Sequence, residues 1–420
     1  MKVENHSNQG KNLPEPASQE LRVITDRYNC TFTEIKKGGP AGYESSLVSN
    51  VADPASDQFY STIKKLNDAP LIFKERRIEQ RNEAELLDFL NKKGGYGMAS
   101  GFKPSGPFHF GHKLTSETLA FFQRNGGQVF MPVADLEAKL DTDLSEKEYT
   151  LWAADNLLDW GACGVDLDAA HVYLQSEERR VNEVSYLLAR GLNFSLPLDI
   201  YGAHKFTESF PFLFAGITQV ADIILPQYPD FGNKHCMLLS GPDQDGHMKM
   251  TQALVERTKN SLPGYNTMPS AVYIPHIRGL TGEKASSSQP ESTIYLGGNR
   301  KNFEKLSLKE RVSESIRKVE EAKKQNFDEY QAFEESMVST FCELEGQAGK
   351  NFIPALEKAL TEHYERKKEV FEYALNKKSS KTAKKPSFWK SHQNAIVDEN
   401  KRNKTQWYNL VCNKQGEVII

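Results

Sequence analysis

Residues 96–124, YGMASGFKPSGPFHFGHKLTSETLAFFQR, contain the pattern that decides the fold. Residues 96–100 are short and apolar, as a buried strand is, and residues 101–106 hold the glycines and proline typical of a turn. Residues 112–124 then place leucine and phenylalanine at helical spacing, and the Asn-Gly-Gly that follows ends the helix. This segment therefore predicts a strand, a turn and a helix in immediate succession.

The same alternation continues on both sides of this segment. Gly94 and Gly95 close a helical pattern that precedes the strand. Strands that alternate with helices form parallel sheets covered by helices, so the sequence predicts an α/β fold. We expect further helices at residues 82–93, 145–160, 181–190 and 246–259, and further strands at residues 129–134, 171–174 and 236–240.

The bulk composition is typical of a globular protein. Hydrophobic residues make up 38% and charged residues 26% of the 420 residues, and a chain of this length predicts two main folded units with tails. No run of 18 apolar residues is present, and residues 1–19 are polar. We therefore expect neither a membrane span nor a secretory signal.

Cysteine usage and net charge narrow the function classes. Cys30, Cys163, Cys236, Cys342 and Cys412 are far apart, odd in number and form no C-x-x-C pair. This argues against a disulfide framework and against a structural zinc site, and it favours a reducing cytoplasm. We expect no protein-held metal. The net charge is −3, so any RNA contact must come from local basic patches.

The composition changes after Gly298, where Lys and Glu become frequent and helical periodicity replaces strand patterns. A lysine-rich tail follows, in which Phe388, Trp389 and Trp407 are expected anchors. We divide the chain into a disordered lead (1–20), an N-terminal extension (21–68), an α/β domain (69–300), a helical domain (301–378) and a basic C-terminal tail (379–420).

The turn that contains Pro107 leads into a helix beginning with His109, Phe110, Gly111 and His112. A helix N-terminus presents unpaired N–H groups and partial positive charge, so it favours phosphate. The two histidines, three residues apart, share a helix face and can both donate hydrogen bonds. The glycine between them leaves room for a flat base. The alternative is a pair of surface histidines after a turn.

A second phosphate-binding candidate lies about 170 residues further on, at Lys284-Ala285-Ser286-Ser287-Ser288 in a glycine-flanked loop. The lysine supplies charge and the serines supply directed hydrogen bonds, which together suit a departing pyrophosphate. Such a loop can close on the reacting nucleotide. The alternative is a serine-rich flexible loop without a ligand.

Together the two motifs resemble the HIGH and KMSKS signatures of class I aminoacyl-tRNA synthetases. Further segments resemble the archaeal type of tryptophanyl-tRNA synthetases, and the resemblance runs from about residue 69 to residue 378. These segments are SGFKPSGP (100–107), VADLEA (133–138), QVADII (219–224), GPDQDGH (241–247) and the stretch 284–296 with its Pro-Glu-Ser.

The resemblance implies a Rossmann-like catalytic domain followed by an all-helical anticodon-binding domain. It implies ATP-dependent activation of tryptophan and its transfer to tRNA(Trp), with Mg²⁺ accompanying the nucleotide, in a cytoplasmic homodimer. The implied catalytic residues are His109, His112, Lys284, Ser286, Ser287 and Ser288. The implied ATP-binding residues are Pro107, His109, Gly111, His112, Gly241, Asp243 and Lys284.

For the amino acid, the resemblance implies contacts with Glu137, Gln219, Asp222 and Gln244. Asp222 could accept a hydrogen bond from an indole N–H or from a phenol O–H, so tyrosine is the alternative substrate. It could also be a helix-surface carboxylate without a ligand. Phe210 and Phe214 are interpreted as pocket walls or as core residues.

The chain departs from the family pattern at several positions. Ala285 replaces the usual methionine of the KMSSS form, and Gly246 replaces a common proline. One branch of the family holds the indole N–H with a tyrosine and a glutamine, and the matching positions here are Ala99 and Pro132. Two other hypotheses stay open at this point: a non-catalytic synthetase paralogue that binds RNA, and a nucleotidyltransferase that makes a small adenylated metabolite.

Overall fold

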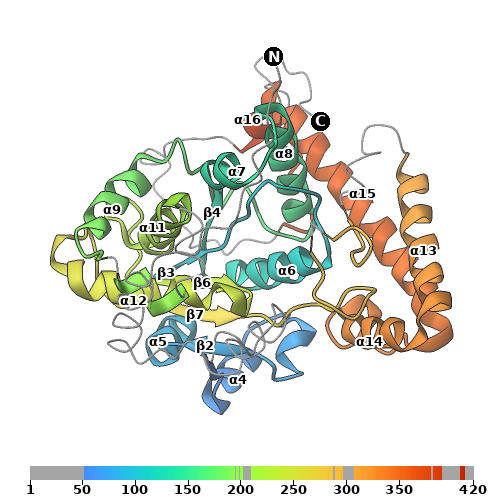
Figure 1. Ribbon diagram of the computed structural model, residues 1–420. Coiled ribbons are helices and arrows are strands. Elements are labelled where there is room, and N and C mark those ends of the chain that lie inside the picture. Colours follow the sequence, from blue (N-terminus) through green and yellow to red (C-terminus); the bar gives the residue numbers. More distant parts are fainter. Residues whose placement is uncertain are drawn as a thin grey trace, which may run out of the picture. The chain divides into compact units, whose positions relative to one another are not determined.

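The computed structural model describes residues 52–193, 195–197, 199–201, 210–286, 289–296, 307–379, 382–389 and 407–411 (Figure 1). The expectations for residues 1–51, and those for Ser287 and Ser288, lie outside the described residues. Residues from Ala52 onward belong to one compact unit.

The described residues form a seven-stranded sheet in the order β1-β2-β7-β6-β3-β4-β5. Its parallel part contains β7, β6, β3, β4 and β5, and the short strands β1 and β2 extend it antiparallel. This arrangement confirms the predicted α/β fold. The strands are β1 (Asp53–Pro54), β2 (Glu79–Arg81), β3 (Tyr96–Ala99), β4 (Gln128–Val133), β5 (His171–Leu174), β6 (His235–Ser240) and β7 (Ser270–Tyr273).

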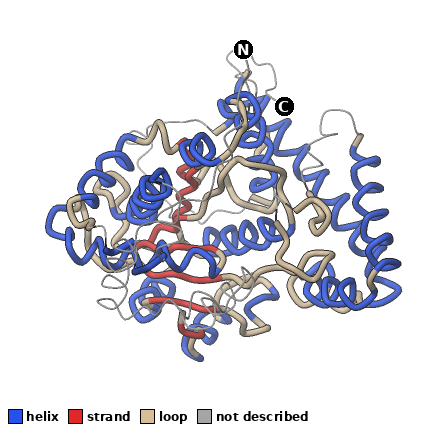
Figure 2. Tube along the Cα trace, viewed as in Figure 1, coloured by secondary structure: helices blue, strands red, loops and turns tan. Residues whose placement is uncertain are grey.

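Helices cover both faces of the sheet, which lies between them in Figure 2. Because successive strand residues point to opposite faces, the two sides of β4 enter different parts of the core. Val129, Met131 and Val133 pack with α6 (Phe110–Arg124) and α8 (Glu146–Ala162). Phe130 packs with α9 (Arg179–Ala189), α11 (Phe210–Ile224) and α12 (Asp245–Thr258). The parallel strands are therefore buried on both sides, which explains their continuous apolar sequences.

The strand order reverses beside β3, and this reversal predicts where a ligand site lies. The chain leaves β3 through α6 to reach β4 on one side, whereas it leaves β6 through α12 to reach β7 on the other side. The loops after β3 and β6 therefore diverge at the carboxyl ends of two adjacent parallel strands. In open α/β sheets, ligands bind in the crevice at such a reversal.

The residues described after 306 are mainly helical, as the Lys- and Glu-rich composition predicted. They form α13 (Leu308–Gln325), α14 (Phe327–Val338) and α15 (Phe352–Lys378), followed by the short α16 (Tyr408–Val411). Ser307 caps α13, with Glu310 completing a reciprocal capping box. The long helix α15 packs against α8 of the α/β part (Figure 1). The structure also describes the helices α4 (Asp57–Lys64), α5 (Glu83–Lys92) and α7 (Asp135–Asp141).

Trp389 and Trp407 anchor the described parts of the basic tail, as expected from the sequence. Both indoles are buried. The Trp389 indole N–H donates to the carbonyl of Gly161 at 2.9 Å, and the Trp407 indole N–H donates to Asp168 at 2.9 Å. A buried indole usually finds a partner for its N–H, and both of these partners lie at the carboxyl end of α8 or just beyond it. None of the described helices is both long and apolar enough to cross a bilayer.

Candidate active site

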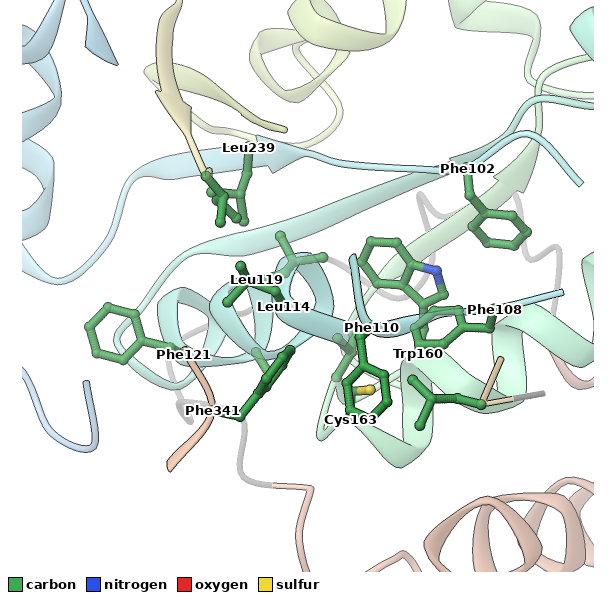
Figure 3. Packing of buried hydrophobic residues seen from close by; sticks show 14 of the residues in the cluster. Phe102, Phe108, Phe110, Leu114, Leu119, Phe121, Trp160, Cys163, Leu239 and Phe341 are labelled. Atoms are coloured by element: carbon green, nitrogen blue, oxygen red, sulfur yellow. The ribbon is translucent and has the colours of Figure 1, made fainter. Parts of the chain in front are cut away.

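Two buried phenylalanines fix the turn between β3 and α6. Phe108 and Phe110 are almost completely buried on either side of His109. The Phe108 ring lies 6.4 Å from the Trp160 ring, and the Phe110 ring lies 5.3 Å from the Phe341 ring, centroid to centroid (Figure 3). Because both neighbours are held in the apolar core, the His109 backbone has little freedom to move.

His109 is the N-cap of α6, so the helix begins one residue later than the sequence suggested. Its Nδ1 accepts the Gly111 N–H at 3.0 Å, and the Nδ1 of His112 accepts the His109 N–H at 3.4 Å. A backbone N–H can only donate, so both Nδ1 atoms are unprotonated. In the neutral rings the hydrogen must then lie on Nε2. Each imidazole can therefore offer one N–H to a ligand.

The imidazoles of His109 and His112 stack at 3.9 Å between centroids. Burial lowers the pKa of His112 to about 4, Lys284 adds to the shift, and Asp159 opposes it. Burial also lowers the pKa of His109 well below its usual value, with His112 and Lys284 adding to the effect. Both rings are therefore neutral at pH 7, and they would bind phosphate as hydrogen-bond donors rather than as charges.

Gly111 and Pro107 shape the same turn. A Cβ built on Gly111 would lie only 2.8 Å from Cε1 of His109, so a side chain there would displace the imidazole. Pro107 is buried directly before Phe108. The sequence had assigned to Gly111 the role of leaving room for a base, and the structure adds that it leaves room for the capping histidine.

Lys284 provides the positive charge of the site. Its Nζ lies 3.3 Å from Asp243, and Nε2 of His276 lies 3.3 Å from the same carboxylate. Burial alone would raise the pKa of Asp243, but Lys284 and His276 outweigh it and hold that pKa below its usual value. The Lys284 side chain is 46% exposed. The loop after β6 and the lysine–serine loop thus meet at one place.

The residues after the lysine–serine loop connect it to the turn that contains His109. The Ser286 N–H donates to Oγ1 of Thr293 at 2.9 Å, and that hydroxyl donates back to the Ser286 carbonyl at 2.8 Å. Tyr295 forms an antiparallel bridge with His109, and the Leu296 N–H donates to the Phe108 carbonyl at 2.8 Å. The two predicted phosphate motifs are therefore joined by backbone pairing.

Ala285, the departure from the KMSSS form, is buried with only 7% of its surface exposed. Its N–H donates to the carbonyl of Ile277 at 3.0 Å. The position is therefore a packing position. Alanine fills it with fewer contacts than the methionine of related sequences would.

Asp222 is buried on α11, with 2% of its surface exposed, so the interpretation as a surface carboxylate is wrong. It accepts hydrogen bonds from the hydroxyl of Tyr173 at 2.8 Å and from Nε2 of Gln175 at 2.6 Å. Burial raises the pKa of Asp222 to about 7, although both hydrogen bonds lower it. Each carboxylate oxygen has a second lone pair, so the group can accept a further donor.

Sequence reasoning missed Tyr173 and Gln175. The signal was present, because residues two apart at the end of a strand point to the same face. Tyr173 lies in β5 and Gln175 follows it directly, and both face the carboxylate of Asp222. A strand that ends in two polar groups on one face, opposite a lone acidic residue on a helix, could have been recognised as a pocket.

The structure gives a side-chain partner to each of the other predicted amino-acid contacts. Nε2 of Gln219 donates to Oε1 of Gln244 at 2.8 Å, which joins α11 to the loop after β6. Glu137 pairs with Lys103 at 3.3 Å, and its charge is close enough to raise the pKa of Asp222. The interpretation of Phe214 as a core residue is wrong, because this side chain is 59% exposed. The side chain of Phe210 lies outside the described residues.

A buried charge network that the sequence did not suggest lies behind the histidines. Asp159 of α8 accepts hydrogen bonds from Nε2 of His363 and from Nζ of Lys367, both at 2.8 Å. Lys367 also forms an ion pair with Asp155 at 2.5 Å. The His363 ring stacks on Phe108 with 6.2 Å between centroids. Helix α15 is thereby connected to the turn that positions His109 and His112.

Metal ligation by the protein has no support in the part of the chain that the structure describes. No group of three or more His, Cys, Asp or Glu side chains is placed there as a metal ion would need. His235, which neighbours Cys236 on β6, is instead bonded to hydroxyls, with Nδ1 at 2.7 Å from Thr267 and Nε2 at 2.9 Å from Ser270.

The sequence profile of the family described as tRNA synthetases class I (W and Y) matches residues 91–380, well over half of the chain. The chain belongs to this class I family of tryptophanyl- and tyrosyl-tRNA synthetases. The match confirms the resemblance that the two phosphate motifs and their neighbouring segments indicated.

Two relatives within the family are named tryptophan–tRNA ligase. The chain is 33% identical to the tryptophan–tRNA ligase of Methanocaldococcus jannaschii over 231 residues, or 54% of this chain and 61% of that protein. It is 35% identical to the tryptophan–tRNA ligase of Methanopyrus kandleri over 203 residues, or 47% of this chain and 52% of that protein. The chain thus spans between 52% and 61% of the length of these two curated relatives.

Solved synthetase structures share the fold. The tryptophanyl-tRNA synthetase of the hyperthermophilic archaeon Aeropyrum pernix K1 superposes with a TM-score of 0.56 at 25% identity, covering 74% of this chain and 89% of that chain. A tryptophanyl-tRNA synthetase from Encephalitozoon cuniculi, bound to tryptophan, superposes with a TM-score of 0.59 at 16% identity, covering 78% and 94%. At the second identity the likeness concerns the fold alone.

Proposed function

We propose that the protein is a tryptophan–tRNA ligase, which activates tryptophan with ATP and transfers it to tRNA(Trp). The observation that carries the proposal is the buried carboxylate of Asp222, held by two donors and able to accept a third. An indole N–H is a donor without acceptor capacity, so it suits this group. Phenylalanine lacks such a donor and would leave the buried carboxylate without its partner, which strongly disfavours it.

The ATP phosphates would be bound where the two family motifs meet. In this proposal Nε2–H of His109 and of His112 donate to phosphate oxygens, and Lys284 neutralises their charge. The N-terminus of α6 adds its partial positive charge. Pro107 and Gly111 would shape the surface for the adenine, while Gly241 and Asp243 contact the nucleotide from the loop after β6. Ser286, with Ser287 and Ser288, would bind the leaving pyrophosphate.

The first step needs no general base, because the amino-acid carboxylate is already ionised. A carboxylate oxygen bonds to the α-phosphorus of ATP, the bond from that phosphorus to the bridging oxygen breaks, and pyrophosphate leaves with the electron pair. Catalysis then depends on holding the two reactants in line and on neutralising charge on the phosphates. Glu137, Gln219 and Gln244 would orient the ammonium and carboxylate ends of tryptophan.

Mg²⁺ would accompany ATP and be held mainly by the phosphates. Asp243 is the carboxylate that the described residues place beside Lys284, and Lys284 already pairs with it at 3.3 Å. That arrangement fits a nucleotide-borne ion rather than a protein cage. When bound, the ion would offset negative charge on the phosphate oxygens.

In the second step a hydroxyl of the terminal adenosine of tRNA(Trp) replaces AMP on the activated carboxyl group. The helices α13, α14 and α15 would form the anticodon-binding domain, with the domain boundaries expected from the sequence. We further propose that the protein acts in the cytoplasm as a homodimer, as the family resemblance implies.

Charging of a tRNA(Trp) transcript tests this proposal directly. Radiolabelled tryptophan should become acid-precipitable in the presence of ATP, and radiolabelled tyrosine should not with either a tRNA(Trp) or a tRNA(Tyr) transcript. Charging of tRNA(Tyr) with tyrosine would retain the family and overturn the assignment of Asp222 to an indole. A mock reaction without ATP is the matched control.

A further inference from the structure

A single lysine of α13 contacts the segment that joins the two phosphate motifs. Nζ of Lys318 donates to the carbonyl of Thr293 at 2.6 Å and also to the carbonyl of Pro290. The same ammonium lies 5.7 Å from the centroid of the Tyr295 ring. One charged group from the helical part of the chain thus touches three residues of the segment 290–295.

The segment that Lys318 holds is itself the connection between the motifs. Thr293 exchanges two hydrogen bonds with Ser286 of the lysine–serine loop. Tyr295 bridges to His109. Displacing the carbonyl of Thr293 would therefore move the partners of both Ser286 and His109.

An open space adjoins this contact between α13 and the segment. A cavity of about 270 Å³ lies between them. Its lining includes Glu291 and Tyr295 from the segment, and Arg311, Glu314 and Lys318 from α13. The hydrogen bonds of Lys318 therefore join α13 to the segment at the wall of this space.

We propose that Lys318 is a positioning residue for adenylate formation, which couples the helical part of the chain to the ATP site. It holds the segment 290–295 so that the lysine–serine loop and the His109 turn keep one mutual arrangement. The proposal rests on the proposed function for its activity readout. In this proposal Lys318 contacts no substrate, whereas Lys284 is given a direct role at the phosphates.

The test compares three variants in tryptophan-dependent ATP–pyrophosphate exchange. Lys318→Met keeps the apolar stem and removes the donors. Lys318→Arg restores a charged donor. Lys324→Met, at an exposed position on the same helix, is the matched control. Lys318→Met should lower kcat/KM for ATP by about tenfold or more, the equivalent of one lost hydrogen bond to a charged group. KM for tryptophan should change less than twofold, because the Asp222 pocket lies on other elements.

Hydrogen–deuterium exchange gives a readout that does not depend on activity. The Ser286 and Leu296 amides, bonded to Thr293 and to the Phe108 carbonyl, should exchange faster in Lys318→Met, while the amides of β3, β6 and α15 keep their rates. Lys318→Arg should restore slow exchange and most of kcat/KM for ATP.

The outcomes separate this proposal from the proposed function. Unchanged amide exchange at Ser286 and Leu296 in Lys318→Met would overturn the positioning role, whatever the activity. An equal loss of kcat/KM in Lys324→Met would overturn it as well. If the wild-type protein exchanges pyrophosphate with no amino acid, the proposed function fails, but the amide exchange still decides whether Lys318 holds the segment.

Discussion

Replacing Lys367 by methionine would leave two buried carboxylates without their shared counter-ion. Asp155 and Asp159 lie one helical turn apart on α8, with 1% and 0% of their side chains exposed. Lys367 lies 2.5 Å from one and 2.8 Å from the other. Burial already raises the pKa of Asp155 to about 7, against the effect of Lys367, which lowers it. Burial would also raise the pKa of Asp159, but Lys367 and His363 outweigh it and hold that pKa below its usual value. Because Asp155 is already partly protonated at pH 7, loss of the lysine must protonate Asp159 as well in the folded protein.

The size of this effect follows from the ordinary pKa of aspartate. Protonating at pH 7 a group whose unfolded pKa is about 3.9 costs about 4 kcal/mol, at about 1.4 kcal/mol per pH unit. This agrees with the roughly 3–5 kcal/mol lost when one partner of a buried ion pair is removed. In the variant, the folded-state pKa of this neutral carboxyl lies above its unfolded-state pKa. The free-energy cost of keeping it protonated is therefore absent below the unfolded-state pKa and grows as the pH rises above it. The deficit should therefore shrink as pH falls from 7 towards 4.

Urea unfolding, followed by circular dichroism at pH 7 and again at pH 5, measures this loss. Lys367→Met should lose about 4 kcal/mol of unfolding free energy at pH 7 and clearly less at pH 5. Lys368→Met is the matched control, since Lys368 forms an exposed pair with Glu372 and its loss should change stability by about 0.5 kcal/mol or less. The double variant Asp159→Asn/Lys367→Met should recover much of the loss. A Lys367→Met deficit no larger than that of Lys368→Met would refute the reasoning.

Three further predictions concern the site. Lys284→Ala should slow adenylate formation by about 10²–10³-fold in pyrophosphate exchange, with an unchanged circular dichroism spectrum because the side chain is half-exposed; normal turnover would remove Lys284 from the mechanism. Asp222→Asn should lower kcat/KM for tryptophan by about 10–100-fold and leave KM for ATP within a factor of two, so an equal loss for both substrates would argue for misfolding. Because the pKa of Asp222 is about 7 and only its ionised form accepts freely at both oxygens, kcat/KM for tryptophan should fall about tenfold per unit below pH 7. A flat profile from pH 5.5 to 8 would contradict the assignment of Asp222.

Much of the parallel sheet could be predicted from the sequence, because a strand buried on both faces appears as an apolar run between turn residues. The predicted strand 171–174 is β5, and the predicted strand 96–100 contains β3. The strands β1, β2 and β7 were missed. They are two to four residues long, and their pairing depends on partners far away in the sequence, which local periodicity cannot show.

The end of the helix before β3 shows a limit of local reasoning. Gly94 and Gly95 were expected to close it, but the left-handed residue at its C-cap is Lys93, with φ of 52°. Glycine is the usual residue for that conformation, so the pattern located the helix end within two residues but not the residue that adopts it.

The site divides in the same way. His109, His112 and Lys284 could be proposed from the sequence because phosphate chemistry requires particular residue types in particular turns. The pairing of Asp159 with His363 and Lys367 could not, because it joins residues more than 200 positions apart. The (i, i+4) spacing of Asp155 and Asp159, and of His363 and Lys367, was visible, but such spacing is usually found on solvated helix faces.

Amino-acid-dependent ATP–pyrophosphate exchange across all twenty amino acids tests the central claim most directly. The account predicts exchange with tryptophan alone, since Asp222 offers a buried acceptor and no other natural side chain combines an indole-sized ring with a lone donor. Exchange with tyrosine in place of tryptophan would contradict the account of the pocket, and exchange with none would contradict the assignment of the enzyme itself.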